Sequence, residues 1–446
     1  MRRKIGVLAV AGPVIVCSGL ATGQVGRTEI TKWQYGKSGA VSLTFDDGSI
    51  NQFRVAVPIM DKFGFPATFF IITGNIPGSQ YHGAFVGRPT KTIVDETAKV
   101  PTDKDNFFER ASAIGFLGYQ GTLDYHARAG ELYDEGKNVE LAYRLLDEGY
   151  AKVRAGEFQR QKARAISSDD HNHISWNKLV ALAQSGYEFA SHTVTHPRLA
   201  VLDDPNLAYE LEKSRQDILD HLGFKHTFSV ECPYGTENER AVRAALVRYQ
   251  VARNHMPDPG VDDLDRWNEM DPAASHKEYV RWQRGPLTAT PMELMKSWVD
   301  RTGARDNIWL VLVFHGLDGV GWEPKTSVEL RDYFSYIKSK EEKLWVATFQ
   351  DVTKYMRERL HGQVVSYRDG DVISVVLRSD LTDVSYDLAL TLKTYVPKEW
   401  KTVELQQGER TKHVVVVQAK DEAYVMYQAV PDAEVVTLSR ATEETQ

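Results

Sequence analysis

Between about residues 40 and 360, short apolar runs alternate with amphipathic stretches of helical period, and this alternation restricts the fold more than any other sequence feature. Residues 40–45, 67–72 and 308–314 are apolar runs that predict strands, whereas apolar side chains recur at helical spacing in residues 175–185. Strand–helix alternation over such a length predicts a parallel sheet covered by helices, either open or closed into a barrel.

Two segments interrupt this pattern. Residues 80–168 lack strand signals and are rich in charge, Ala and Leu, which predicts a helical insertion in a main domain of residues 24–361. Such an insertion is either part of a binding cleft or a peripheral decoration, and the sequence leaves both open. Residues 362–446 carry short β-rich runs split by Asp, Gly and Pro, which predict a small all-β sandwich as an accessory domain.

The first 23 residues have the order of a secretory signal peptide. A basic start of Arg2, Arg3 and Lys4 precedes the apolar run 5–20, and small residues follow at 21–23. We therefore expect the protein to be secreted or periplasmic, with an uncleaved anchor as the alternative. No later apolar run is long enough to cross a bilayer, so no membrane span is expected in the mature chain.

Composition and charge give no support to nucleic acid as a partner. The chain is 42% hydrophobic and 26% charged, which is typical of a globular protein, and its net charge of -7 gives no reason to expect a nucleic-acid partner. Its two cysteines are Cys17, in the predicted signal peptide, and Cys232, so no internal disulfide is expected after cleavage.

The strongest local signal is the end of the first predicted strand, where residues 43–48 read LTFDDG. Successive strand residues point to opposite faces, so Asp46 and Asp47 can take different roles only where the strand ends and the backbone turns. One carboxylate can then bind a metal while the other takes a proton. The alternative is an acidic turn that closes the strand, because Asp-Gly pairs are common in turns.

A pair of histidines follows another predicted strand. His192 and His196 come directly after the run 187–190, and their i, i+4 spacing places them on one side of a helical turn, which suits joint binding of one metal. Together with one carboxylate they form a two-His, one-carboxylate set that leaves positions open for water and substrate. A chance surface pair is the alternative, but the carboxyl ends of parallel strands gather on one face, where active sites lie.

A third strand end carries His315, directly after the apolar run 308–314. A histidine at this place can protonate a leaving group. A structural histidine that caps the strand is the alternative.

Taken together, four motifs resemble the polysaccharide deacetylase family, also called carbohydrate esterase family 4. They occur in the family's order: residues 44–48 (TFDDG), His192 with His196 (HxxxH), Pro233-Tyr234-Gly235, and His315. The resemblance covers about residues 38–360, interrupted by the predicted insertion. It implies a distorted (β/α) barrel as the fold of the main domain.

The resemblance also implies a site and a reaction. A divalent metal ion, with zinc as the expected ion, would be held by Asp47, His192 and His196. Asp46 would act as general base, His315 as general acid, and the Tyr234 backbone N–H as an oxyanion donor in a loop shaped by Pro233 and Gly235.

The sequence departs from the family in two places. Glu231 stands two residues before Pro233, where family members usually carry an Arg that pairs with the catalytic Asp. We expect Arg253, at the end of the strand-like run 250–253, to emerge beside Glu231 and offset its charge; a solvated strand-end charge is the alternative. The Asp/Trp motif of the family has no clear counterpart, although residues 262–267 contain both residue types.

These observations predict a metal-dependent hydrolase that removes N- or O-linked acetyl groups from a polysaccharide or oligosaccharide. A covalent acyl-enzyme is not expected, since the sequence has no GxSxG nucleophile elbow. Two alternatives stay open. One is a metal-dependent hydrolase of a non-acetyl amide or ester, and the other is a catalytically impaired cell-surface protein that binds glycans.

Overall fold

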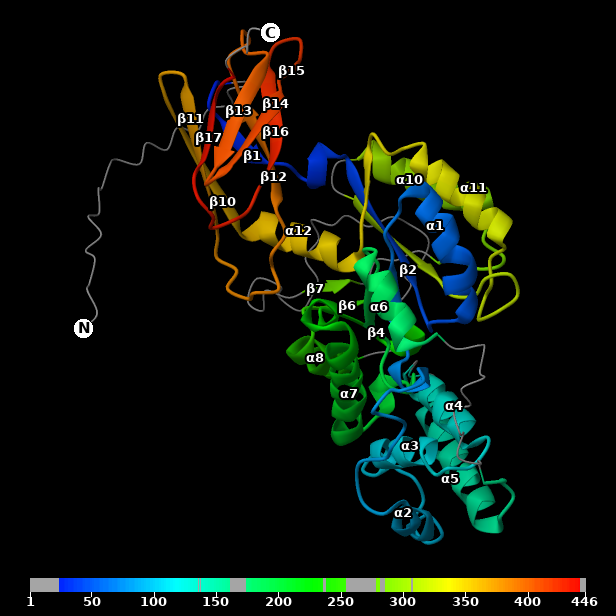
Figure 1. Cartoon of the computed structure of the whole chain (residues 1–446). Coiled ribbons are helices and arrows are strands. Elements are labelled where there is room, and N and C mark those ends of the chain that lie inside the picture. Colours follow the sequence, from blue (N-terminus) through cyan, green and yellow to red (C-terminus); the bar gives the residue numbers. More distant parts are fainter. Residues whose placement is uncertain are drawn as a thin grey trace, which may run out of the picture.

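The computed structural model describes residues 24–134, 136, 138–160, 174–235, 238–253, 278–280, 285–305 and 308–441. The predicted signal peptide and residues 262–267 lie outside these ranges. Figure 1 shows a central α/β part, a β-rich part in orange and red at one end, and cyan helices at the other. In the described ranges, no helix combines the length and the apolar character needed to cross a membrane.

The central part is built on a parallel sheet with the strand order β7-β6-β5-β4-β3-β2-β8, and β9 pairs with the start of β2. Its strands are β2 (Gly39–Phe45), β3 (Thr68–Ile71), β4 (Glu188–Ser191), β5 (Ser229–Glu231), β6 (Val251–Arg253), β7 (Glu278–Val280), β8 (Ile308–Phe314) and β9 (Leu344–Val346). Among the described residues no pairing joins β7 to β8, so the sheet is an open, curled form of the predicted distorted barrel.

Helices between the strands, and one after the last strand, cover this sheet. They are α1 (Val57–Phe63), α6 (Trp176–Gln184), α7 (Asp204–Leu222), α8 (Glu239–Arg248), α10 (Met292–Ala304), α11 (Ser327–Lys338) and α12 (Phe349–His361). Several begin at a side chain that accepts a hydrogen bond from the first turn, such as Asp203 before α7 and Thr326 before α11. These caps explain why the helices begin at these residues.

The two faces of strand β2 have different surroundings. Val41, Leu43 and Phe45 belong to the hydrophobic core between the sheet and its helices, and each such side chain stabilises the fold by about 1.5–3 kcal/mol. Thr44 and Asp46 lie on the opposite face and are also buried. The inner face of the curl therefore holds polar groups that lead to the end of the strand.

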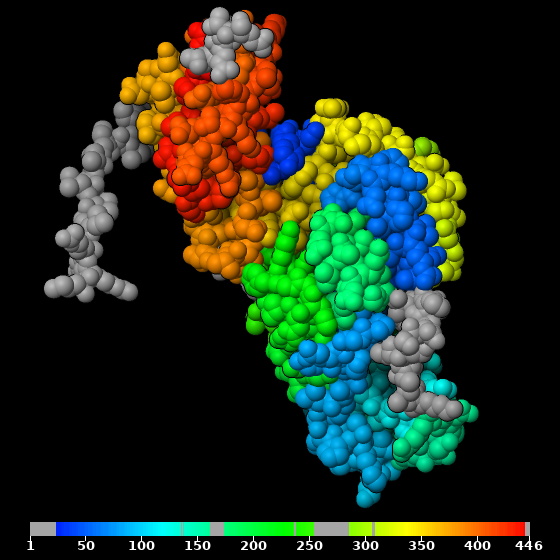
Figure 2. All heavy atoms as spheres, viewed as in Figure 1, coloured from blue at the N-terminus to red at the C-terminus, as the bar shows by residue number. Residues whose placement is uncertain are grey.

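The predicted insertion is helical. Its helices are α2 (Thr90–Glu96), α3 (Phe107–Gly115), α4 (Thr122–Asp134) and α5 (Val139–Ala155). They enclose a core of their own, in which the rings of Phe107 and Tyr133 stack with centroids 4.3 Å apart. Figure 2 shows the insertion as a protrusion at the end of the molecule opposite the β-rich part.

The β-rich part is a sandwich of two antiparallel sheets, as predicted. One sheet has the order β1 (Thr28–Ile30), β12 (Leu390–Tyr395), β16 (Ala423–Ala429) and β15 (Val417–Gln418). The other has the order β10 (Gly362–Asp369), β11 (Val372–Ser379), β17 (Val436–Arg440), β13 (Thr402–Gln407) and β14 (Arg410–Val415). Strand β1 precedes the central sheet in the sequence, so the sandwich draws on both ends of the described chain.

A continuous hydrophobic core joins the sandwich to the central part. Helix α12 supplies Phe349 and Tyr355, and the sandwich supplies residues such as Leu392 and Trp400 to the same core. The Tyr355 hydroxyl also donates a hydrogen bond of 2.8 Å to the carbonyl of Thr31, which follows β1. The sandwich is therefore packed against the central part rather than connected by an exposed linker.

Candidate active site

The carboxyl ends of the parallel strands meet at one cavity. Strand β2 leads to Asp46 and Asp47, and β4 and β8 lead to His192 and His315. The cavity has a volume of about 380 Å³. It is lined by Asp46, Asp47, His192, His196, Arg198, Glu231, Tyr234, Gly235, Val313, His315 and Trp322.

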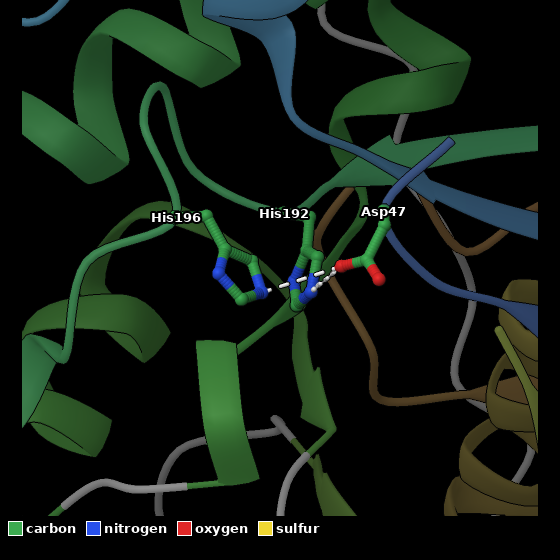
Figure 3. A group of neighbouring side chains, drawn as sticks. All are labelled: Asp47, His192 and His196. Carbon is green, nitrogen blue, oxygen red and sulfur yellow. Dashed lines mark ion pairs between the residues drawn. The ribbon is translucent and has the colours of Figure 1, made fainter. Parts of the chain in front are cut away.

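Asp47, His192 and His196 form a cluster that could hold a metal ion. Their ligand atoms all lie within 4.8 Å of one another, and Asp47 Oδ1 is 3.5 Å from His192 Nε2 and 3.3 Å from His196 Nε2. Figure 3 shows both rings turned toward the Asp47 carboxylate. The Nδ1 atom of His192 lies 3.2 Å from the carbonyl oxygen of Glu231, which orients the ring and leaves Nε2 for a ligand bond. The donors fit a divalent metal.

Charge and burial act together on two of these groups, Asp47 and His196. Burial disfavours an ionised Asp47, but the hydrogen bond with His192 and the charges of the histidines hold its pKa below the usual range. Burial, with the charge of His192, lowers the pKa of His196 to about 3, so this imidazole is neutral at pH 7. An ionised carboxylate and a neutral imidazole are the forms that bind metals.

The loop between the two histidines is not the helical turn expected from their spacing. Residues 192–198 have no helical structure, and Thr193 and His196 have φ values of 67° and 63°, in the left-handed region. Glu210 on α7 holds the loop instead: its carboxylate accepts hydrogen bonds from the backbone N–H groups of Val194 and Thr195 at 2.9 Å each. The rings therefore converge through loop geometry fixed by a neighbouring helix.

Asp46 belongs to a buried ion network with Arg253 and Glu231. The Arg253 guanidinium donates from Nη2 to Asp46 Oδ2, from Nε to Glu231 Oε2 at 2.8 Å, and from Nη1 to Thr44 Oγ1 at 2.5 Å. The exposed fraction of the side chain is 0% for Arg253 and 4% for each carboxylate. Burial raises the pKa of Glu231, and one guanidinium cannot neutralise two carboxylates, so Glu231 keeps a proton more readily than an exposed glutamate.

The structure thus supplies a guanidinium to Asp46 from a different strand than the family pattern suggests. Arg253 ends β6, which pairs with β5 so that Arg253 lies opposite Glu231. Its guanidinium also lies over the ring of Phe70, 4.5 Å from the centroid. The sequence left open the alternative that Arg253 is a solvated charge at a strand end. This alternative is wrong, because the side chain is fully buried.

His315 lies beside Asp46 at the end of β8. Its Nε2 atom is 3.5 Å from Asp46 Oδ2, and its ring meets the Trp322 ring edge-on with centroids 4.6 Å apart. Burial lowers the pKa of His315. The Gln52 amide donates hydrogen bonds to the backbone carbonyls of His315, at 2.8 Å, and Asp46, at 2.5 Å. Gln52 therefore keeps the two strand ends together.

Tyr234 lies across the cavity on the Pro233-Tyr234-Gly235 turn. Tyr234 and Gly235 have φ values of 63° and 60°, so two successive left-handed residues reverse the chain there. The Tyr234 ring contacts the His196 ring, with centroids 4.6 Å apart, and the Arg198 guanidinium, whose Cζ lies 4.5 Å from its centroid. The turn thereby packs directly on a candidate metal ligand.

Several residues around the site were missed by the sequence analysis. Gln52, Glu210, Arg198 and Trp322 contact or line the site from loops and helices. None of them lies at a strand end, and a single polar residue in a helix or loop carries no periodic signal. Only Arg198 stands close to a motif, two positions after His196.

Known proteins are similar in sequence to part of this chain. A gellan lyase from a Bacillus species is 24% identical over 270 residues, which cover 57% of this chain and 11% of that protein. The chain therefore spans about a tenth of the length of this relative.

Two solved structures match much of the chain at low sequence identity and low TM-score. A protein described as a polysaccharide deacetylase from Mycobacterium smegmatis is 14% identical, with a TM-score of 0.40, over 76% of this chain and 96% of its own. A peptidoglycan N-acetylglucosamine deacetylase is 12% identical, with a TM-score of 0.35, over 71% and 89%. Both TM-scores are below 0.5, so no assignment rests on these two structures.

The family model described as polysaccharide deacetylase matches residues 34–99 and 133–251. These residues include Asp46, Asp47, His192 and His196, together with the Pro233-Tyr234-Gly235 turn. Over the part that carries these groups, the chain is therefore similar to the polysaccharide deacetylase family.

Proposed function

We propose that this protein is a metal-dependent hydrolase that removes acetyl groups, N- or O-linked, from a polysaccharide or oligosaccharide. One observation carries the proposal. The candidate metal ligands Asp47, His192 and His196 share a cavity with a carboxylate, Asp46, and an imidazole, His315, that are 3.5 Å apart. The match to the polysaccharide deacetylase family supports the substrate class.

Zinc is the proposed ion, because two imidazole nitrogens and one carboxylate oxygen are a common zinc donor set that leaves a position open. When bound, such an ion supplies a Lewis acid that polarises an acyl carbonyl and makes water more acidic.

The chain's own residues would carry the proton transfers. Asp46, held in place by Arg253, takes a proton from the attacking water, and His315 donates a proton to the departing amine or sugar oxygen. The Tyr234 backbone N–H donates a hydrogen bond to the carbonyl oxygen as negative charge develops on it. The shared position of Asp46 beside both Arg253 and His315 supports this division of roles.

The proposed location is outside the cytoplasm, either secreted or periplasmic. The basic, apolar and small-residue order of residues 1–23 supports it.

Two other functions compete with this one. A metal-dependent hydrolase of a non-acetyl amide or ester would use the same groups on a different bond. A glycan-binding protein without turnover is suggested by Glu231 at the position of the family's Arg, but the Arg253 guanidinium beside Asp46 weighs against it.

An acetate-release assay tests the proposal. The metal-free protein is reloaded with zinc, cobalt, nickel or manganese and incubated with acetylated xylan, acetylated pectin and chitooligosaccharides. We expect metal-dependent acetate release from at least one glycan, abolished by chelation. Hydrolysis of a non-acetyl substrate alone would favour the first competing function, and binding without release would favour the second.

A further inference from the structure

Arg198 is a largely buried cation in the cavity wall, and its guanidinium has few polar contacts among the described residues. Its side chain is 12% exposed, and in the described chain its guanidinium donates no hydrogen bond. Its Nε atom is fully buried without a partner. The nearest carboxylate oxygen, Asp134 Oδ2, is 3.9 Å from Nη1, which is at the outer limit of an ion pair.

A guanidinium whose N–H donors lack acceptors favours the binding of a ligand that supplies an acceptor. Arginine has five N–H donors in a planar fork, and donors buried without acceptors cost free energy that a bound carboxylate can recover. The Arg198 guanidinium also lies over the face of the Tyr234 ring, with Cζ 4.5 Å from the centroid, and this contact uses none of its N–H donors as a hydrogen bond. Arg198 also lines the same cavity as Asp47 and His315, so a ligand group that meets it belongs to the substrate of this site.

The helical insertion sets the position of Arg198. The buried ring of His126, on α4, lies 2.9 Å from the Ala111 carbonyl through Nδ1 and accepts the backbone N–H of Arg198 at 3.1 Å through Nε2. Burial lowers the pKa of His126 to about 4, which keeps the ring neutral and able to act as both donor and acceptor. The backbone at Arg198 is therefore fixed by a helix outside the barrel.

Gly130 leaves space for the side chain of Arg198. Gly130 lies inside helix α4, where glycine is less stable than alanine by about 0.5–1 kcal/mol. A Cβ atom at this position would approach Arg198 Cδ to 2.6 Å. The absence of a Cβ atom at Gly130 therefore allows the Arg198 side chain to pass close to helix α4.

We propose that Arg198 is a specificity-determining residue that binds a carboxylate of the glycan, so that the site prefers acetylated glycans that carry carboxylates near the acetyl group. This inference rests on the proposed deacetylase function. It also assigns a role to the insertion, which holds the selecting arginine in the wall of the cavity. The carboxylate can belong to a uronic acid or to a lactyl ether on an amino sugar, since both offer the same planar acceptor.

A purely structural role for Arg198 makes a different prediction. If the guanidinium only supported the Tyr234 ring, its loss would lower turnover of charged and neutral substrates alike. A carboxylate-binding role instead changes the ratio between the two, and that ratio is the quantity to measure.

The first test uses the unaltered, metal-loaded protein. Acetate release from O-acetylated polygalacturonate is compared with release from its carboxyl-reduced form, and release from an N-acetylmuramic acid-containing chain is compared with release from chitooligosaccharides. We expect kcat/KM to be about tenfold or more higher for the carboxylated member of at least one pair, the size expected for hydrogen bonds to a charged group. The pair that shows the preference identifies the source of the carboxylate.

The second test uses variants. Arg198→Gln should reduce the charged-to-neutral ratio to about one, and Arg198→Lys should keep part of it, because an ammonium retains the charge without the bidentate fork. Arg243→Gln is the matched control, since Arg243 pairs with Glu239 on the exposed face of α8, away from the cavity. Its ratio should equal that of the parent protein.

The outcomes separate this inference from the function on which it rests. Equal kcat/KM within both substrate pairs would overturn the role of Arg198 while the deacetylase function stands. A preference that survives in Arg198→Gln would overturn it as well. No acetate from any of the four glycans, charged or neutral, would instead count against the deacetylase function itself.

Discussion

Arg253 donates a hydrogen bond from Nη2 to Oδ2 of Asp46, although the two residues are 207 positions apart in the sequence. The same guanidinium binds Glu231, so a single buried cation serves two buried carboxylates. This relationship explains how a chain with Glu in place of the family's Arg can still place a guanidinium against the proposed catalytic base. It also makes the network sensitive to the loss of any one member.

Removal of Arg253 should therefore destabilise the fold and impair catalysis. Arg253→Ala leaves both carboxylates buried without their cation, and we expect the free energy of unfolding to fall by about 3–5 kcal/mol in urea denaturation. Adding Glu231→Gln should recover part of the stability. If the two substitutions are simply additive, Arg253 does not compensate Glu231.

The metal ligands give a second prediction. His192→Ala and His196→Ala should each abolish tight metal binding and acetate release, because an incomplete ligand set does not retain the ion. Metal content after dialysis, measured by atomic emission, is the readout. His413→Ala, on an exposed strand of the sandwich, is the matched control and should keep its metal. Stoichiometric metal in the His192→Ala, His196→Ala double variant would refute the assignment.

His315 should be required for turnover but not for metal binding. His315→Gln removes the proposed general acid, and we expect kcat to fall by about 10²–10⁴ with the metal content unchanged. The loss should be smaller on substrates with a good leaving group, such as aryl acetates, which need no proton donor. An equal loss on glycans and aryl acetates would contradict the general-acid role.

A buried glutamate beneath the site predicts how stability depends on pH. Burial raises the pKa of Glu188 from 4.5 to about 7, against opposing hydrogen bonds from the Gln350 backbone N–H, Thr68 and Ser229. The folded state therefore binds more protons than the unfolded chain between these values. The free energy of unfolding should decrease as pH rises from 4.5 to 7, by about 3 kcal/mol in total.

The variant Glu188→Gln tests this dependence. Its amide oxygen can accept from Thr68 and the Gln350 N–H, while its NH₂ group donates to Ser229, so the network is kept without a titrating group. The difference in the free energy of unfolding, variant minus parent, should be larger at pH 8 than at pH 5. Parallel stability curves for the two proteins between pH 4.5 and 7 would show that Glu188 is not responsible.

The sandwich should be needed for folding rather than for chemistry. Deletion of residues 362–446 would expose core residues that α12 shares with it, such as Phe349 and Tyr355, and we expect an insoluble or unfolded product. Tyr367→Ser, on the exposed face of β10, should leave acetate release unchanged. A folded, metal-binding protein after the deletion would show that the central part is stable alone.

Much of the central fold could be predicted because its signals are local. Apolar runs such as the one that forms β8 predict the positions of strands. Polar residues directly after such a run indicate which side chains lie at the end of the strand. Parallel strands have one common carboxyl edge, so Asp46, Asp47, His192 and His315 could be grouped without any knowledge of their contacts.

Other features depend on chain segments that meet only in the folded protein. The i, i+4 spacing of His192 and His196 suggested a helical turn, but contacts from Glu210 on α7 favour a loop with left-handed residues. Strand β1 is three residues long, and its pairing with β12 could not be read from so short a segment.

The sequence by itself determined the strand–helix order and the residues at the strand ends, because hydrophobic periodicity and adjacency are properties of neighbouring positions. The strand-end position of Arg253 also predicted that it lies beside Glu231. Only the tertiary structure decided that the same guanidinium binds Asp46, that Gln52 ties Asp46 to His315, and that the insertion contacts the site through His126 and Arg198. These are contacts between distant segments. Their geometry follows from how the sheet curls and the helices pack, which no local pattern encodes.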